Sequence, residues 1–156
     1  MSEGEATAVV RLRELRDDDY LTVANRLDEW WGGREMTAML PRLFFQHFQP
    51  TSFAAVDDAG SICGFLCGFV SQTDPTLAYI HFVGVDPAAR AHGIGSMLYE
   101  AFFAAARARG CKSVSCVTAP VNVASQRFHE RLGFSLSLKD DYDGPGVPRY
   151  VMRRAL

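Results

Sequence analysis

The segment from Val83 to Gly95 constrains this chain more than any other. It begins as an apolar strand, passes through a short loop and enters a helix whose first turn holds Gly93 and Gly95. Backbone N–H groups at a helix start have no intrahelical acceptor and lie at the positive end of the helix dipole. Because glycine lets a diphosphate approach these groups closely, the segment predicts a phosphate-binding loop.

Two common phosphate loops fit this segment poorly. A P-loop ends in Gly-Lys-Ser/Thr, whereas Gly95 is followed by Ser96 and Met97, with no lysine in reach. A dinucleotide fingerprint needs a third glycine where Leu98 stands, and a strand, helix, strand unit early in the chain. Neither nucleotide class is therefore favoured.

A third pattern, R-x-x-G-x-G at Arg90, Gly93 and Gly95, resembles the coenzyme A loop of the GNAT N-acetyltransferase superfamily. A second segment, Asn122 to Phe134, is similar to that family's N-x-x-A-x-x-L-Y-x-K-x-G-F helix. The two motifs follow one another as they do in the family, and the resemblance extends over residues 8 to 154. The chain is identified as a member of this superfamily, with no subfamily assigned.

Composition narrows the class of protein. The chain has 156 residues, 48% of them hydrophobic, and a formal net charge of −2, which fits a single domain, residues 1–156, with a sizeable core. This charge disfavours nucleic acid as a partner, because phosphate neutralisation needs clustered Lys and Arg. The acidic segment Met1 to Glu5 lacks the order of a signal peptide, and no apolar run is long enough to span a bilayer. We therefore expect a cytoplasmic protein with no membrane partner.

The four cysteines are expected to be reduced and buried. Cys63 and Cys67 share a predicted strand, where four residues separate them by about 13 Å, too far for both to bind one zinc ion. Cys111 and Cys116 flank the start of a later strand, without a histidine pair at zinc-finger spacing. No metal site is expected.

Apolar periodicity and turn residues predict alternating strands and helices. The stretch from Ile62 to Val70 is apolar on both sides, which is typical of a central strand covered by helices on both faces. The run Asp17 to Asp19 is expected to provide an N-cap and a negative first turn for the first helix. The expected strands are 9–15, 52–56, 62–70, 77–85, 113–118, 134–138 and 147–153, and the expected helices are 17–29, 37–48, 93–109 and 122–132.

This order of elements predicts a three-layer α/β fold. We expect a mixed, mostly antiparallel sheet of about six or seven strands, with helices on both faces. The family resemblance implies the same architecture, the acyl-CoA N-acyltransferase (GNAT) fold.

The resemblance also implies a reaction, in which an acetyl group passes from acetyl-CoA to a primary amine by direct attack in a ternary complex. It assigns the pantetheine arm to the backbone of Val83 and Val85 and to Asn122, which can also cap its helix. The loop amides that it assigns to the pyrophosphate are those of Arg90, Ala91, His92, Gly93, Ile94, Gly95 and Ser96. Acetyl-CoA is the cosubstrate implied, and the family makes a homodimer plausible.

His81 is the predicted catalytic base. An alkylamine with a pKa near 10.4 is charged at pH 7, and deprotonating it costs roughly 4.6 kcal/mol. Family members often carry a glutamate four residues before the position of Val85, where this chain has His81. Imidazole can accept that proton directly or through water. The alternative is a histidine that is hydrogen-bonded within a half-buried strand.

His129 is the predicted catalytic acid, because its position in the second motif is commonly the tyrosine that protonates coenzyme A. Asn122, Ser125 and His129 share one helical face, so the side chain at 129 is expected to point toward the thiol. A histidinium is well matched to a thiolate with a pKa near 8.5. A packed or water-bonded histidine, with solvent as the donor, is the alternative.

The family resemblance implies that the acceptor amine enters between the first two helices and the loop before the last strand. The candidate side chains are Trp30, Trp31 and Arg34, facing the acidic stretch 140–143. Tryptophans beside carboxylates suit a cationic or aromatic amine, and Arg34 suits a substrate carboxylate. A tryptophan pair that caps the core beside a solvated loop is the alternative.

The partner implied is therefore a small-molecule or peptide amine. A rival from another class is a non-catalytic acyl-CoA-binding or regulatory module, because the family's tyrosine and glutamate are both missing. A hydrolase is disfavoured, because Ser125 and His129 have no acidic third member. Turnover separates the transferase from the binding module.

Overall fold

The computed structural model describes residues 9–33 and 36–156. The elements in chain order are β1 (Arg11–Glu14), α1 (Asp19–Trp30), η1 (Thr37–Met39), α2 (Leu43–His47), η2 (Gln49–Thr51), β2 (Phe53–Val56), β3 (Ile62–Val70), β4 (Leu77–Val85), η3 (Pro87–His92), α3 (Ile94–Ala108), β5 (Ser113–Thr118), α4 (Val123–Arg131), β6 (Ser135–Lys139) and β7 (Arg149–Ala155). Within these residues, the strands form one seven-stranded sheet in the order β1-β2-β3-β4-β5-β7-β6. Neighbouring strands are antiparallel except β4 and β5, which are parallel.

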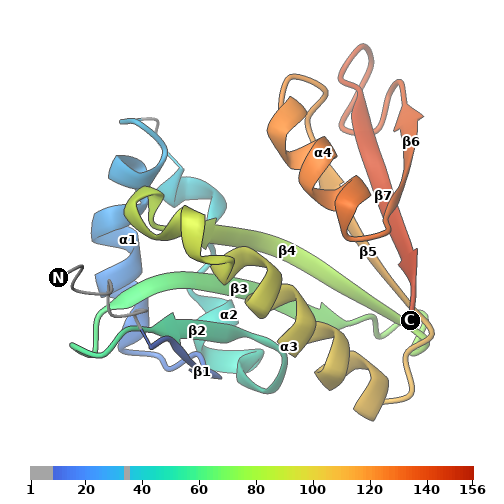
Figure 1. Cartoon of the computed structure of the whole chain (residues 1–156). Helices are drawn as coiled ribbons and strands as arrows, with labels where there is room; N and C mark the ends of the chain where they lie inside the picture. The colour runs from blue at the N-terminus through green and yellow to red at the C-terminus, as the bar shows by residue number, and fades with distance from the viewer. Residues whose placement is uncertain (1–8, 34–35) are drawn as a thin grey trace, which may run out of the picture.

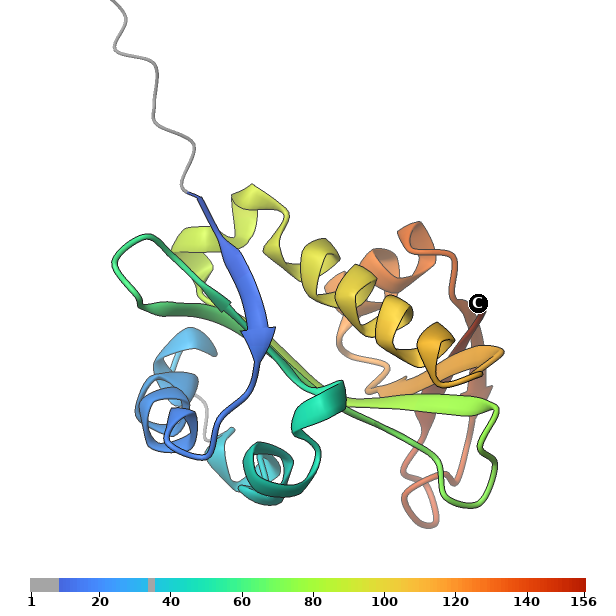
Figure 2. The same ribbon diagram turned by 90° about the horizontal axis from the view of Figure 1, so that it is seen from below.

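Helices cover both faces of this sheet (Figures 1 and 2). Helices α1 and α2 lie on one face, and α3 and α4 lie on the other. Each face has its own apolar core, centred on Leu27 and Phe45 beneath α1 and α2, and on Leu98 and Phe102 beneath α3. The predicted three-layer α/β fold is confirmed.

Strand β3 is the central strand that its sequence predicts. Its residues from Ile62 to Gly68 are all buried, and both cores draw on them: Leu66 packs in the α3 core and Phe65 in the α1 core. A strand with apolar residues on alternate sides can support two layers at once. This is why β3 reads as a continuous apolar run and shows no alternation with polar residues.

The sheet forks between β4 and β5. These strands are paired only at Leu77, Ala78 and Tyr79, opposite Ser113, Val114 and Ser115. Beyond that point β4 runs on to Val85 and β5 to Thr118, and the two arms diverge (Figure 1). The backbone of β4 from Ile80 to Val85 therefore has no partner strand on the β5 side among the described residues.

The expected helix over 37–48 is wrong in part. Only η1 and the short α2 form, and Leu40 between them is extended, with φ −111° and ψ 91°. Pro41 explains the break, because proline lacks an N–H and disfavours the helical conformation in the residue before it. The break also leaves the carbonyl of Met39 without a helical donor.

The acidic run at the start of α1 places Asp19 in the first turn of the helix, as expected, but it does not supply the expected side-chain cap. Asp18 occupies the N-cap position, but its side chain makes no capping hydrogen bond. Asp19 is buried instead, and its carboxylate accepts two hydrogen bonds from the Arg13 guanidinium, at 2.7 and 2.9 Å, and one from the Arg16 N–H. The carboxylate therefore ties α1 to β1.

No helix in the described part of the chain combines the length and the apolar character that crossing a bilayer requires.

Candidate active site

The predicted phosphate loop has the geometry of an anion site. The Asp86 side chain accepts a hydrogen bond from Ala88 N at 3.0 Å, and Gly93 has a φ of +69°, which glycine adopts without strain. Helix α3 begins at the next residue, and Met97 N donates its intrahelical bond to Gly93 O. Helix geometry leaves the N–H groups of Ile94, Gly95 and Ser96 without an intrahelical acceptor, at the positive end of a 15-residue helix.

Two arginines connect this loop to α1. Arg26 Nη2 donates to Asp86 Oδ2 at 2.9 Å, and Arg90 Nη2 donates to Trp30 O at 3.3 Å. The guanidinium of Arg90 is therefore held by the end of α1. These bonds fix the loop against the rest of the fold.

The open edge of β4 lies directly before this loop. Val83 and Val85 are half-buried, and Val85 Cγ2 lies 4.0 Å from where a Cβ on Gly95 would be. A peptide-like arm with amide groups could hydrogen-bond to the unpaired backbone here as an added strand does. An extended arm that ends in phosphates, as in coenzyme A, fits this combination of open strand and helix start.

His81 lies at a β-bulge in β4. Cys67 of β3 pairs with Phe82 and Gly68 pairs with Ile80, so His81 is the extra residue between them. A bulge re-aims a side chain, and here the imidazole projects toward the α1 and α2 layer. It stacks on Phe44, with ring centroids 4.8 Å apart and planes 8° apart.

The hydrogen bond of His81 identifies its free nitrogen. Nε2 lies 3.1 Å from the carbonyl of Met39, the same carbonyl that the break at Pro41 leaves without a helical donor. A carbonyl only accepts, so Nε2 carries the hydrogen in the neutral ring and Nδ1 is left to accept a proton. The side chain is exposed. The geometry therefore provides an oriented, solvent-accessible base.

His129 lies in a different environment. It is 6% exposed, and the rings of Tyr99, Phe128 and Phe134 surround it edge-on at centroid distances of 5.2 to 5.5 Å. Its Nδ1 lies 2.6 Å from Ser125 O, and its Nε2 lies 2.6 Å from the Tyr99 hydroxyl. Burial lowers its pKa, an effect that the bond to Ser125 O opposes. A neutral ring with both nitrogens engaged has no free hydrogen to donate, so these contacts weigh against His129 as the acid.

Asn122 occupies the N-cap of α4. Its Oδ1 accepts from Ser125 N at 3.3 Å, which leaves the amide NH₂ group free to donate to a ligand. The cap is thus present as the sequence predicts, and it leaves the side-chain amide available to a ligand.

The predicted acceptor residues are divided between core and surface. Trp30 is 5% exposed and packs on Phe65. Trp31 is half-buried, with its ring 5.4 Å from that of Phe82 and next to Gly84 on β4. Of the pair, Trp31 is therefore the one that can meet a ligand directly. Arg34 lies outside the described residues.

The acidic loop between β6 and β7 is largely occupied with its own structure. Asp143 Oδ2 accepts from Arg149 Nε at 2.8 Å, and Asp141 Oδ1 accepts from Gly146 N. Tyr142 is 49% exposed, and together with Asp143 it adds to the effect of burial in raising the pKa of Tyr79 to about 12. Because β4 and β5 part just after Tyr79, the loop approaches the base of the fork.

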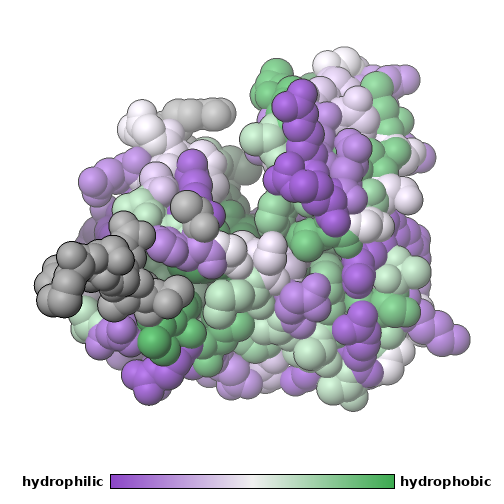
Figure 3. Space-filling view, in the orientation of Figure 1, coloured by the Kyte–Doolittle hydropathy of each residue, from purple (hydrophilic) through white to green (hydrophobic). Residues whose placement is uncertain are grey.

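The surface is hollowed between the two arms of the fork (Figure 3), so the fork is open to solvent on this side.

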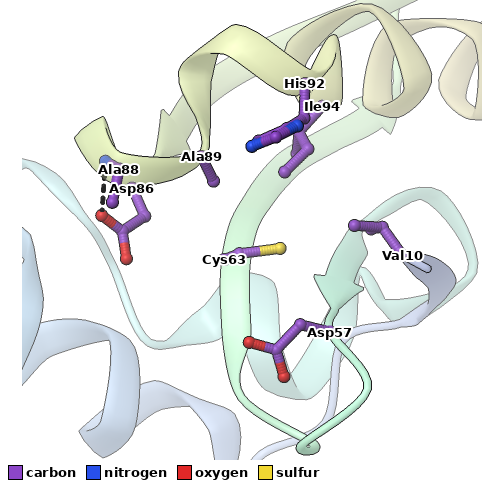
Figure 4. A pocket seen from close by; sticks show the side chains of 8 residues that line it. All are labelled: Val10, Asp57, Cys63, Asp86, Ala88, Ala89, His92 and Ile94. Carbon is purple, nitrogen blue, oxygen red and sulfur yellow. Dashed lines mark hydrogen bonds between the residues drawn. The ribbon is translucent and has the colours of Figure 1, made fainter. Parts of the chain in front are cut away.

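A separate cavity of about 220 Å³ lies behind the phosphate loop, where the Cys63 thiol and the His92 ring point inward (Figure 4). Its lining comes from the loop, the start of α3 and the β1 to β3 region, with no residue from β5 or α4. The described residues contain no cluster of three or more His, Cys, Asp or Glu side chains arranged to bind a metal.

Comparison with known protein families shows to which family this chain belongs. The sequence model described as the acetyltransferase (GNAT) family matches residues 9–134. The chain belongs to the acetyltransferase (GNAT) family. The loop and the Asn122 helix, on which the resemblance rests, both lie within the matched region.

Individual relatives agree with this GNAT membership. A mycothiol acetyltransferase from Gordonia bronchialis is 30% identical over 80% of this chain, which spans 43% of that protein. The crystal structure of Ard1 from Thermoplasma volcanium superposes with a TM-score of 0.77 at 26% identity, over 94% of this chain and 97% of that one. Diaminobutyrate acetyltransferase EctA from Paenibacillus lautus, determined with its substrate and coenzyme A, has a TM-score of 0.70 at 21% identity, over 93% and 95% of the two chains. The last shows likeness of fold alone.

Sequence reasoning missed two parts of this GNAT site. Tyr99 was not singled out, although it places a hydroxyl on a helix face otherwise made of Ile94, Leu98 and Phe102. Phe44, which stacks on His81, is distant in sequence, and no local pattern connects the two residues.

Proposed function

We propose that this protein is an acetyl-CoA-dependent N-acetyltransferase that acts on a primary amine of a small molecule or peptide, by direct attack in a ternary complex. The observation that carries the proposal is the fork. It joins the face of the sheet that holds the phosphate loop to the face that holds His81, and elsewhere the paired strands separate these faces.

The residues present fit the cosubstrate. The N–H groups of Ile94 to Ser96 would hold the pyrophosphate, the open edge of β4 would pair with the pantetheine arm, and Asn122 would donate to it. Bound acetyl-CoA supplies an activated acetyl thioester at the fork. The residues that would bind acetyl-CoA therefore lie on the α3 side of the sheet.

His81 prepares the amine on the opposite face. An ammonium group entering beside Trp31 loses its proton to Nδ1 of His81, directly or through a water molecule. Loss of a second proton from the nitrogen balances the proton that the departing thiolate takes up, so one proton is released for each ammonium acetylated. Solvent can supply the proton that the departing thiolate takes up, because a thiol with a pKa near 8.5 is mostly protonated at pH 7.

The proposal is tested by turnover. The protein is incubated with acetyl-CoA and a panel of polyamines, amino acids including L-2,4-diaminobutyrate, aromatic amines, aminoglycosides and peptide amino termini. Free coenzyme A and the acetylated amine are separated by chromatography, so that both products are measured directly. Amine-dependent release of coenzyme A is expected. Tight coenzyme A binding with no acetylated product from any amine would favour the non-catalytic module.

The role of His81 has its own test. His81→Gln is expected to lower the turnover rate by about 10²-fold, with coenzyme A affinity within twofold of the wild type, because the ring lies on the acceptor side. His47→Gln changes an exposed histidine at the end of α2 and serves as the matched control. An unchanged rate in His81→Gln would remove the residue from the mechanism.

A further inference from the structure

The two arms of the fork are joined a second time through α3 and α4. Tyr99 is 2% exposed on α3, and its hydroxyl lies 2.6 Å from Nε2 of His129 on α4. Among the residues that the structure describes, this is the one side-chain hydrogen bond between these two helices. Helix α3 packs on β2, β3 and β4, whereas α4 packs on β6 beyond the fork.

The direction of this bond is fixed by the second nitrogen of the ring. Ser125 O, 2.6 Å from Nδ1, can only accept, so Nδ1 carries the hydrogen in the neutral ring. Nε2 then has a lone pair and no hydrogen, and it accepts from the Tyr99 hydroxyl. Each polar atom of the pair is thus satisfied inside an aromatic enclosure, and a buried bond of this kind strongly favours one relative placement of two helices.

This placement affects the cosubstrate site. Phe128, the residue before His129, lies against the first turn of α3, where a Cβ on Gly95 would be 3.3 Å from its Cζ. One turn before His129, Ser125 N donates to Asn122 at the cap of α4. A shift of α4 would therefore move both the wall beside the phosphate-binding turn and the side chain expected on the pantetheine arm.

We propose that Tyr99 is a positioning residue for the acyl donor: through His129 it holds α4 at the distance from α3 and β4 that the coenzyme A arm requires. This inference rests on the proposed function and deepens it. Tyr99 touches neither substrate. Its effect is transmitted by the helix that carries Asn122.

The test is coenzyme A binding by calorimetry, which needs no acceptor amine. Tyr99→Phe keeps the ring and its aromatic contacts and removes only the hydroxyl. We expect the dissociation constant for coenzyme A to rise about tenfold, the loss typical of one buried hydrogen bond. With an active acceptor, the KM for acetyl-CoA should rise more than kcat falls. Tyr20→Phe is the control, because its hydroxyl makes no hydrogen bond with the described residues and its ring packs on Phe45, in the core beneath α1 on the other face of the sheet.

A double variant separates positioning from stability. In Tyr99→Phe combined with His129→Phe, neither buried partner is left unsatisfied, and the larger ring at 129 can fill the space of the lost hydroxyl. We expect the thermal midpoint to recover toward the wild type while coenzyme A affinity stays low. Imidazole ¹⁵N spectra should show the Nδ1–H tautomer of His129 in the wild type and a shifted Nε2 signal in Tyr99→Phe.

Two results would overturn the inference. One is a coenzyme A affinity in Tyr99→Phe within twofold of the wild type, even if the variant melts earlier, because the bond would then be structural only. The other is an Nε2–H tautomer in the wild type. If the wild type itself binds no coenzyme A, the proposed function and this inference fail together. If the inference fails alone, the wild type still binds coenzyme A in the calorimetric titration.

Discussion

At the scale of single residues, Gly68 shows how closely β3 packs against α3. A Cβ at this position would lie 2.4 Å from Phe102 Cε2 and 2.9 Å from Tyr79 O. Phe102 is fully buried, and the carbonyl belongs to the neighbouring strand, so neither can move aside cheaply. The absence of a side chain at Gly68 is thus a condition for the helix to reach the sheet.

We expect Gly68→Ala to lower the free energy of unfolding by about 1–3 kcal/mol, as overpacking of a core does. Urea denaturation measures this. Because Phe102 is the closest neighbour, the double variant Gly68→Ala, Phe102→Leu should lose less than the sum of the two single losses, by at least about 1 kcal/mol. Strictly additive losses would show that the clash is not with Phe102.

Single residues also show where sequence reasoning succeeds and stops. The cap at Asn122 follows from a local rule, and the structure contains it. The environment of His129 does not follow from such rules, because Tyr99 comes from a helix 30 positions away in sequence. The motif predicts which helical face residue 129 occupies, but a facing residue determines which hydrogen bonds the ring makes.

At the scale of elements, α4 depends on Asn122 in two ways that a pair of substitutions can separate. Aspartate is as good an N-cap as asparagine, but it has no NH₂ group to donate to a ligand. Asn122→Asp should therefore keep the thermal stability of the wild type and weaken coenzyme A binding. Asn122→Ala should weaken binding and also lower the free energy of unfolding by about 1 kcal/mol.

Melting curves and calorimetric titrations of the two variants provide the comparison. Equal coenzyme A affinity in Asn122→Asp and the wild type would leave the residue with its capping role alone.

Element boundaries were predictable wherever propensity and packing agree. The strand 62–70 and the helix that ends before Gly110 have the expected places. The helix over 37–48 was expected to run without interruption up to Pro50, but Pro41 breaks it. This segment supplies the Met39 carbonyl that orients His81, so the wrong helix prediction also concealed a contact of the candidate site.

At the scale of the whole molecule, titration of His129 should contribute to the pH dependence of stability. Burial holds its pKa below that of an exposed imidazole, which is near 6.5. As the pH falls below about 6.5, the unfolded chain binds a proton that the folded chain does not. The stability contributed by the neutral ring is therefore complete above that pH and decreases toward pH 5.

Thermal midpoints between pH 7.5 and 5 test this expectation. The decrease should be smaller in His129→Phe, and His47→Gln, a change at an exposed histidine, serves as the control. An unchanged slope in His129→Phe would mean that the ring is charged in the native state.

The bulge at His81 has a consequence for how β4 tolerates change. Ala78, Ile80, Val83 and Val85 all face the α3 core, so the alternation of sides shifts by one position at residue 81. Substitutions at 81 leave this shift in place. Deletion of the single residue would restore a regular ladder, because Ile80 and Phe82 already pair with adjacent residues of β3, and it would leave Phe82 facing the α1 core and the valines facing the α3 core. The strand therefore carries His81 as an insertion that the packing of the two cores does not need.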